Sequence, residues 1–213
     1  MRGPSGLLMP RRSALARSAH LRSVKRIAIL ASGSGSNAQR LIEHFQRSSV
    51  ADVVLVAGDR PEAGVFTRAW ELGVPSYRFT PAQLRDGTVL RELQALRVDL
   101  VVLAGFLRLV PADLVRAFPG RIVNIHPALL PRHGGQGMWG HHVHAAVLAA
   151  GDRESGITIH RVNERYDEGE HLFQARCPVL PDDSPETLAL RVLALEHAHY
   201  PRVVELVVMA IGL

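Results

Sequence analysis

Cysteine and long hydrophobic runs are scarce in this chain of 213 residues, and its first 26 positions hold no acidic residue. Cys177 is the only cysteine, so an internal disulfide and a cysteine-cluster zinc site are both excluded. No apolar run approaches the ~20 residues that span a membrane, and we expect no membrane partner. A hydrophobic content of 47% with 21% charged residues is typical of a globular protein. The expected compartment is the reducing cytoplasm.

The charge is unevenly distributed along the chain. The first 26 residues hold seven of the 25 basic side chains, which leaves 18 basic and 20 acidic residues, a net −2, in the other 187. A nucleic-acid-binding body would carry a basic surface of its own, so no nucleic acid is expected as a partner. The basic arm has the composition of a transit peptide, but a disordered extension or a start at Met9 is the simpler interpretation. We expect residues 1–24 to be an extension and 25–213 to be one domain.

Apolar strands alternate with helical segments in the first part of this domain. We predict strands at 26–31, 52–57, 75–78, 98–104 and 121–125, and helices at 37–45, 62–72, 90–96 and 111–117. Strands without polar alternation, joined by helices, form a parallel sheet that is covered on both faces.

The pattern changes after Pro131. A helix is predicted at about 142–150, strands at 158–162 and about 172–179, and a long helix from Ser184, whose cap is Ser184-Pro185-Glu186-Thr187. The predicted class is therefore α/β: an open, mostly parallel Rossmann-like sheet with helices on both faces and an antiparallel C-terminal extension.

A glycine-rich turn, residues 32–37 (SGSGSN), joins the first strand to the first helix. Small residues there let backbone N–H groups approach an anion at a helix N-terminus. The turn is neither a Walker loop nor a full dinucleotide fingerprint, because it lacks a Lys-Ser/Thr pair and a third glycine. A tight turn capped by Ser36 or Asn37 explains it equally well, and a phosphate is the favoured ligand if it binds one.

Asn124 and His126 follow one another by two positions at the end of the last parallel strand. Ligands of open α/β sheets bind outside the carboxyl ends of the strands, and side chains two apart in an extended segment share a side. An amide stabilises a developing oxyanion and an imidazole moves a proton near neutral pH. Since neither is a nucleophile, direct transfer between two bound substrates is indicated. On its own, Asn-x-His is more often a buried hydrogen-bonding pair.

Four segments together resemble the folate-dependent formyltransferase family: SGSGSN, VVLAGFLRLV around Ala104, NIHPALLP and ERYDEGEHLFQ. The resemblance runs from about Lys25 to the C-terminus, and NIHPxLLP followed by Asp167-x-Gly169 is specific for the formyl-transfer domain. It implies transfer of the formyl group of 10-formyltetrahydrofolate to the amine of 5′-phosphoribosylglycinamide (GAR). The product would be formyl-GAR in purine (IMP) biosynthesis.

The resemblance also implies roles for individual residues. Asn124 would stabilise the oxyanion, His126 would be the general acid/base, and Asp167 would hold His126 and raise its pKa, with His160 in support. The phosphate of GAR would bind Gly35, Ser36 and Asn37, and its glycinamide part Glu196. The folate would contact Arg85, Leu107, Arg108, Leu109, Val110, Asn124, Asn163 and Asp167.

Three stretches depart from the family pattern. Residues 132–141 form a longer loop than usual after NIHPALLP, and we expect it to reshape the mouth of the site. Glu170 stands where proline commonly follows Asp-x-Gly. Gly58-Asp59 stands where the family has a Ser-Asn pair after the second strand. None of these removes a residue of the catalytic trio.

Related activities provide alternatives. A formyltetrahydrofolate hydrolase uses water as the nucleophile but usually carries an N-terminal regulatory domain. Methionyl-tRNA formyltransferase usually adds a C-terminal barrel and holds tRNA, which the net charge of −2 does not favour. A phosphate-binding α/β module without activity is a third alternative, against which the trio argues. A monomer and a homodimer both remain open.

Histidines at 133, 141, 142 and 144 suggest a zinc site by their spacing. The chain contains no HExxH motif, and in the family the matching positions lie at a helix start without metal. We therefore expect no metal cofactor.

Overall fold

The computed structural model describes residues 24–211, so the predicted extension at 1–24 lies outside this range except for Val24. The described chain contains one seven-stranded sheet of order β3-β2-β1-β4-β5-β6-β7. Its strands are β1 (Lys25–Leu30), β2 (Ala51–Gly58), β3 (Ser76–Arg78), β4 (Leu100–Leu103), β5 (Ile122–His126), β6 (Glu154–Arg161) and β7 (His171–Pro178).

Pairing in the sheet divides it into two parts. Strands β1 to β5 are parallel to one another, whereas β6 pairs with β5 and β7 in antiparallel fashion. All four residues of β4 and the last four of β1 are buried, as expected for central strands covered on both faces. The predicted fold class is confirmed, including the antiparallel extension.

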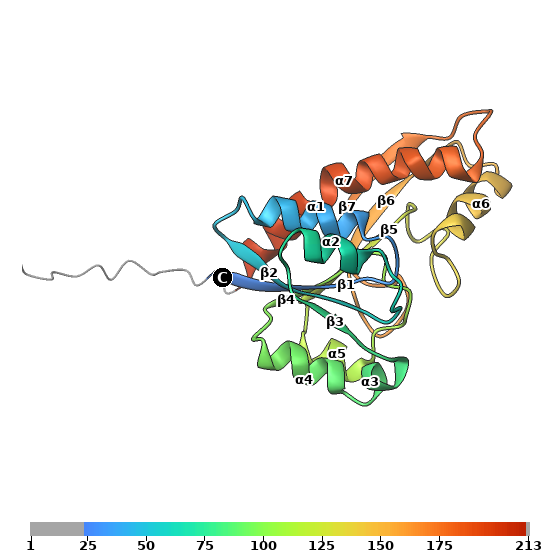
Figure 1. The fold of residues 1–213 in the computed structure, drawn as a ribbon. Coiled ribbons are helices and arrows are strands. Elements are labelled where there is room, and N and C mark those ends of the chain that lie inside the picture. Colours follow the sequence, from blue (N-terminus) through green and yellow to red (C-terminus); the bar gives the residue numbers. More distant parts are fainter. Residues whose placement is uncertain (1–23, 212–213) are drawn as a thin grey trace, which may run out of the picture.

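Helices cover both faces of the sheet (Figure 1). One face is covered by α1 (Ser36–Phe45), α2 (Val65–Glu71) and α7 (Pro185–Ala210), and the other by α3 (Pro81–Arg85), α4 (Thr88–Ala95) and α5 (Ala112–Ala117). The remaining helix, α6 (His141–Ala149), packs against α7. No helix within residues 24–211 is long and apolar enough to cross a membrane.

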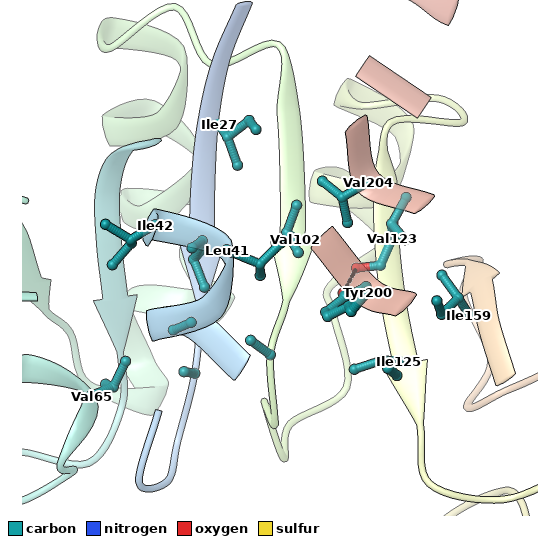
Figure 2. Packing of buried hydrophobic residues seen from close by; sticks show 14 of the residues in the cluster. Ile27, Leu41, Ile42, Val65, Val102, Val123, Ile125, Ile159, Tyr200 and Val204 are labelled. Carbon is teal, nitrogen blue, oxygen red and sulfur yellow. Dashed lines mark hydrogen bonds between the residues drawn. The ribbon is translucent and has the colours of Figure 1, made fainter. Parts of the chain in front are cut away.

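Tyr200 fastens α7 to the sheet (Figure 2). Its ring is fully buried, and its hydroxyl lies 2.8 Å from the carbonyl oxygen of Leu103 and 3.2 Å from that of Val123. These two carbonyls belong to the neighbouring strands β4 and β5. Burial of an aromatic ring of this size stabilises the fold by about 1.5–3 kcal/mol. The contact holds the middle of α7 over the carboxyl end of β4 and the first half of β5.

Helix boundaries agree with the sequence at some ends and differ at others. Ser184 caps α7 in a capping box with Thr187, as predicted. Gly35, rather than Ser36 or Asn37, is the N-cap of α1, and Pro111 precedes α5 as its N-cap instead of starting it. Helix α3 was not predicted, although Thr80-Pro81-Ala82-Gln83 carries a capping box and a proline at its first turn.

Candidate active site

A cavity of about 580 Å³ lies outside the carboxyl ends of β4 and β5. It is bounded by the segment after β4, the loop 135–140, the loop 162–167 and the side of α7. The position is the one expected for a ligand site in an open α/β sheet. Residues of the predicted site that line it are Asn37, Leu107, Arg108, Leu109, Val110, Asn124, His126, His160, Asn163, Asp167 and Glu196.

His126 is the last residue of β5, and only 3% of it is exposed. Its Nε2 lies 2.8 Å from the carbonyl oxygen of His133, and since a carbonyl only accepts, Nε2 must carry a hydrogen. Its Nδ1 lies 3.4 Å from Oδ2 of Asp167. Nδ1 is therefore the nitrogen that is free to gain and lose a proton.

Burial lowers the pKa of His126, although Asp167 and the His133 carbonyl act in the opposite direction. Asp167 acts on this pKa in the expected direction, but the net shift is downward. Asp167 does favour the imidazolium, but desolvation of a nearly inaccessible ring is the larger effect. The imidazole is mainly neutral at pH 7, which suits a group that must first accept a proton.

Asp167 occupies an unusual backbone conformation, with φ +56°, in the loop after β6. Its side chain is 10% exposed, and Oδ2 accepts a hydrogen bond of 2.9 Å from the backbone N–H of Gly135. Burial would raise the pKa of Asp167, but His160, His126 and the Gly135 N–H together lower it. The carboxylate is therefore charged at neutral pH and faces both histidine rings.

Asn124 and His160 stand opposite one another in the β5–β6 pair. His160 Nδ1 donates to the carbonyl of Arg161 at 2.9 Å, so in the neutral ring Nε2 is an acceptor. Asn124 Nδ2 lies 3.1 Å from this Nε2, whereas Oδ1 of Asp167 is more distant at 3.5 Å. The contact orients the Asn124 amide and leaves its second N–H available to a ligand in the cavity.

These three side chains together can perform acyl-transfer chemistry. The neutral imidazole of His126 can take a proton, the Asp167 carboxylate can stabilise the resulting imidazolium, and the oriented amide of Asn124 can stabilise an oxyanion. The structure brings the three predicted catalytic residues and the supporting His160 into one cluster.

The N-terminus of α1 lies at one end of the cavity. Gly35 has φ +80°, and a Cβ at this position would lie 2.6 Å from atoms of Val65. Within the described chain, no side chain caps the first turn of α1, so its N–H groups are free to bind an anion. The predicted phosphate-binding residues Gly35, Ser36 and Asn37 are the first residues of this turn.

Glu196 lies on α7 one turn before Tyr200, and only 8% of it is exposed. Its Oε2 accepts a hydrogen bond of 2.5 Å from Nδ2 of Asn37. Burial raises the pKa of Glu196, and the bond from Asn37 lowers it only in part. The pair joins the predicted phosphate end of the cavity to α7.

Other residues of the cavity did not stand out in the sequence. Three predicted site residues are absent from its lining: Gly35, Ser36 and Arg85. Phe106, Trp139 and His144 line the cavity. His144 is 4% exposed, and burial lowers its pKa. The only signal in the sequence that pointed to His144 was its place among the histidines considered as zinc ligands. Arg85 is exposed on α3 and is not part of the lining, and its folate contact stays a prediction.

The long loop 132–141 is held to the rest of the fold by Asp152. This carboxylate lies 2.5 Å from Nη2 of Arg132 and 2.7 Å from Nε2 of His133. His133 in turn presents its carbonyl to His126. Within residues 24–211, no group of three or more His, Cys, Asp or Glu side chains is arranged to hold a metal.

Residues 25–204 match the family model described as formyl transferase. The chloroplastic phosphoribosylglycinamide formyltransferase of Arabidopsis thaliana is 44% identical over 194 residues, which are 88% of this chain and 66% of that protein. The trifunctional purine biosynthetic protein adenosine-3 of Drosophila melanogaster is 42% identical over 192 residues, 86% of this chain and 14% of that protein. The chain thus spans just under two thirds of the plant relative and a small part of the fly relative.

A solved structure shares the fold closely. The glycinamide ribonucleotide transformylase 1 of Symbiobacterium toebii has a TM-score of 0.81 and 38% sequence identity, and the match covers 87% of this chain and 88% of that one.

Proposed function

The chain belongs to the formyl transferase family, and on that premise we propose that it transfers a formyl group from 10-formyltetrahydrofolate to the amine of GAR. The observation that carries the proposal is the cluster of Asn124, His126 and Asp167 in the wall of the 580 Å³ cavity. Two names support GAR as the acceptor: that of the plant relative and that of the solved bacterial structure.

The reaction begins when the amine of GAR attacks the formyl carbon. The carbonyl oxygen becomes an oxyanion, for which the free N–H of Asn124 is the proposed donor. The amine nitrogen loses a proton and N10 of the folate gains one, so the carbon–N10 bond breaks and tetrahydrofolate and formyl-GAR form. His126 Nδ1 is the proposed relay for this proton, with Asp167 balancing the charge of the imidazolium.

The substrates are proposed to bind at opposite ends of the cavity. The phosphate of GAR fits the uncapped N-terminus of α1 at Gly35, Ser36 and Asn37, and its glycinamide part fits Glu196. The folate fits the opposite wall, which residues 107–110, Asn163 and Asp167 line. A contact from Arg85 would require this exposed side chain to reach toward the mouth.

The proposal involves two small-molecule substrates, without nucleic acid, membrane or metal. A cytoplasmic location, and a monomer or a homodimer, stay predictions. Hydrolysis of the formyl-folate and simple phosphate binding are the alternative functions, and no observation in the described chain favours either.

An assay with purified protein tests the proposal. Incubation with 10-formyltetrahydrofolate and GAR should yield tetrahydrofolate and formyl-GAR in equal amounts. Formate released without GAR would indicate the hydrolase instead. Absence of turnover with either acceptor, from protein whose thermal unfolding is cooperative, would contradict both enzyme functions.

A further inference from the structure

Asp59 is a buried carboxylate outside the catalytic cluster. It follows β2 directly, and its side chain is 2% exposed. Oδ1 accepts a hydrogen bond of 2.6 Å from the hydroxyl of Ser32, and Oδ2 accepts one of 2.5 Å from Nε of Arg108. Both oxygens are thus engaged, by residues that follow two other strands.

Ser32 extends this network to the backbone after β4. Its hydroxyl oxygen accepts a hydrogen bond of 3.2 Å from the N–H of Leu107 while donating to Asp59. One carboxylate therefore connects three segments, those after β1, β2 and β4. Two of the residues so held, Leu107 and Arg108, line the cavity, whereas Asp59 and Ser32 do not.

The close approach of β2 to β1 depends on the glycine that precedes Asp59. A Cβ on Gly58 would lie 2.5 Å from the carbonyl oxygen of Ala31, so a larger residue would push the two strand ends apart. Glycine brings the carboxylate of the next residue within reach of Ser32. Gly58 and Asp59 therefore form the network together: the glycine permits the close approach and the carboxylate makes the bonds.

We propose that Asp59 is a positioning residue that holds the 107–110 wall of the cavity in the shape that receives the formyl donor. It does so through the guanidinium of Arg108 and, by way of Ser32, through the N–H of Leu107. The proposal rests on the proposed function, because the donor is taken to be the folate. Hydrogen bonds to a charged group are stronger than neutral ones, so the charge of Asp59 is the property that matters.

Asp59→Asn is the main variant for the test. The amide keeps an acceptor for Ser32 but loses the charge that Arg108 requires. The probe is 10-formylfolate, the oxidised donor, whose binding is measured by calorimetry without turnover. We expect its dissociation constant to rise about tenfold, and the Michaelis constant for the reduced formyl donor should rise to a similar extent. The Michaelis constant for GAR and kcat should change less than twofold.

Asp52→Asn is the matched control. Asp52 is exposed at the opposite end of the same strand, so the substitution makes the same change of charge far from the cavity. It should leave all four constants unchanged. A merely structural role of Asp59 predicts a different result, in which the melting temperature falls and both Michaelis constants and kcat change together.

A double variant shows whether Asp59 acts through Arg108. The effect of Asp59→Asn on 10-formylfolate binding should be much smaller in an Arg108→Ala background than alone, whereas independent effects would multiply. Ser32→Ala removes the bond to Asp59 and with it the link to Leu107, but leaves the pair of Asp59 with Arg108, and should weaken binding about threefold. Because Ser32→Ala changes no charge, it replaces Asp59→Asn in the test if Asp59→Asn does not fold.

Two negative results have different meanings. Wild-type protein that does not bind 10-formylfolate would contradict the proposed function, and this inference with it. Wild-type protein that binds the probe, with Asp59→Asn or Ser32→Ala binding equally well, would overturn the role of Asp59 alone.

Discussion

The two ends of the cavity are built from different parts of the polypeptide. At the proposed phosphate end, the groups available to a ligand are backbone N–H groups of α1. Gly35 is required there because a side chain at this position would collide with Val65. At the proposed catalytic end, the groups are the side chains of Asn124, His126 and Asp167, which come from one strand and a distant loop. The first end depends on local backbone conformation and the second on tertiary packing.

This difference predicts how the two ends respond to mutation. Substitutions at the catalytic end should lower the rate of the chemical step and leave binding of the phosphate intact. Substitutions at the phosphate end should matter only where they change the backbone, and should act on affinity.

The largest effect is expected for Asp167→Asn. The neutral amide no longer balances the imidazolium of His126, so kcat should fall by about 10²–10⁴-fold. The Michaelis constant for GAR should change little. Steady-state kinetics on protein of unchanged melting temperature measure both values, and a kcat within threefold of wild type would remove Asp167 from the mechanism.

Gly35→Ala should have the next largest effect. Its φ of +80° and the 2.6 Å approach to Val65 oppose a methyl group, and the backbone conformation alone costs about 1–2 kcal/mol. We expect the dissociation constant of GAR to rise tenfold or more, measured by calorimetry. Ser36→Ala keeps every N–H group of the turn and is the control. An equal loss in both variants would show that side chains bind the phosphate.

Tyr200→Phe should destabilise the fold without abolishing activity. The substitution removes a buried hydroxyl donor from the carbonyls of Leu103 and Val123, which costs about 1 kcal/mol. Chemical denaturation should show this decrease in the free energy of unfolding. Tyr77→Phe, at a half-buried position on β3, should change it by less than about 0.5 kcal/mol, and similar values for the two would contradict the role given to Tyr200.

The smallest expected effect is on pH dependence. Because the pKa of His126 is lowered from 6.5, the ring stays neutral below the pH at which a free imidazole protonates. The acidic limb of kcat/KM should therefore lie below pH 6.5. In the folding equilibrium, His126 is protonated more readily when unfolded, so its contribution to stability is lost as the pH falls below 6.5.

A limb above pH 6.5 would mean that Asp167 outweighs burial. Asp167→Asn should shift the limb of the residual activity further down, because the carboxylate favours the charged ring. A pH series of kcat/KM for the two proteins measures both effects.

Most residues of the proposed catalytic end could be predicted from the sequence, although they lie far apart along the chain. Apolar runs such as 98–104 identified the parallel strands, and the resemblance to the formyltransferase family, carried by NIHPxLLP and the later Asp167-x-Gly169, supplied the trio. The contact of His126 with the His133 carbonyl was not predictable, because it depends on an irregular loop that Asp152 holds in place. The Asp59–Arg108 pair was not predictable either, because its two residues follow different strands and no local sequence pattern connects them.

At the proposed phosphate end, the sequence identified the segment but not its detailed structure. The sequence identifies the glycine-rich turn but favours Ser36 or Asn37 as its cap, since side-chain caps are the commoner arrangement. Gly35 takes this position because only a glycine fits beside Val65. The bond from Asn37 to Glu196 joins residues far apart in the sequence, so it required the placement of α7.

GAR binding and formyl transfer, measured on one preparation of His126→Ala, test the contrast between the two ends most directly. We predict a dissociation constant for GAR within twofold of the wild-type value, with formyl transfer reduced by at least about 10²-fold. Near-normal transfer would contradict the role of His126. A large loss of GAR affinity would contradict the claim that the proposed phosphate end binds its ligand independently of the proposed catalytic end.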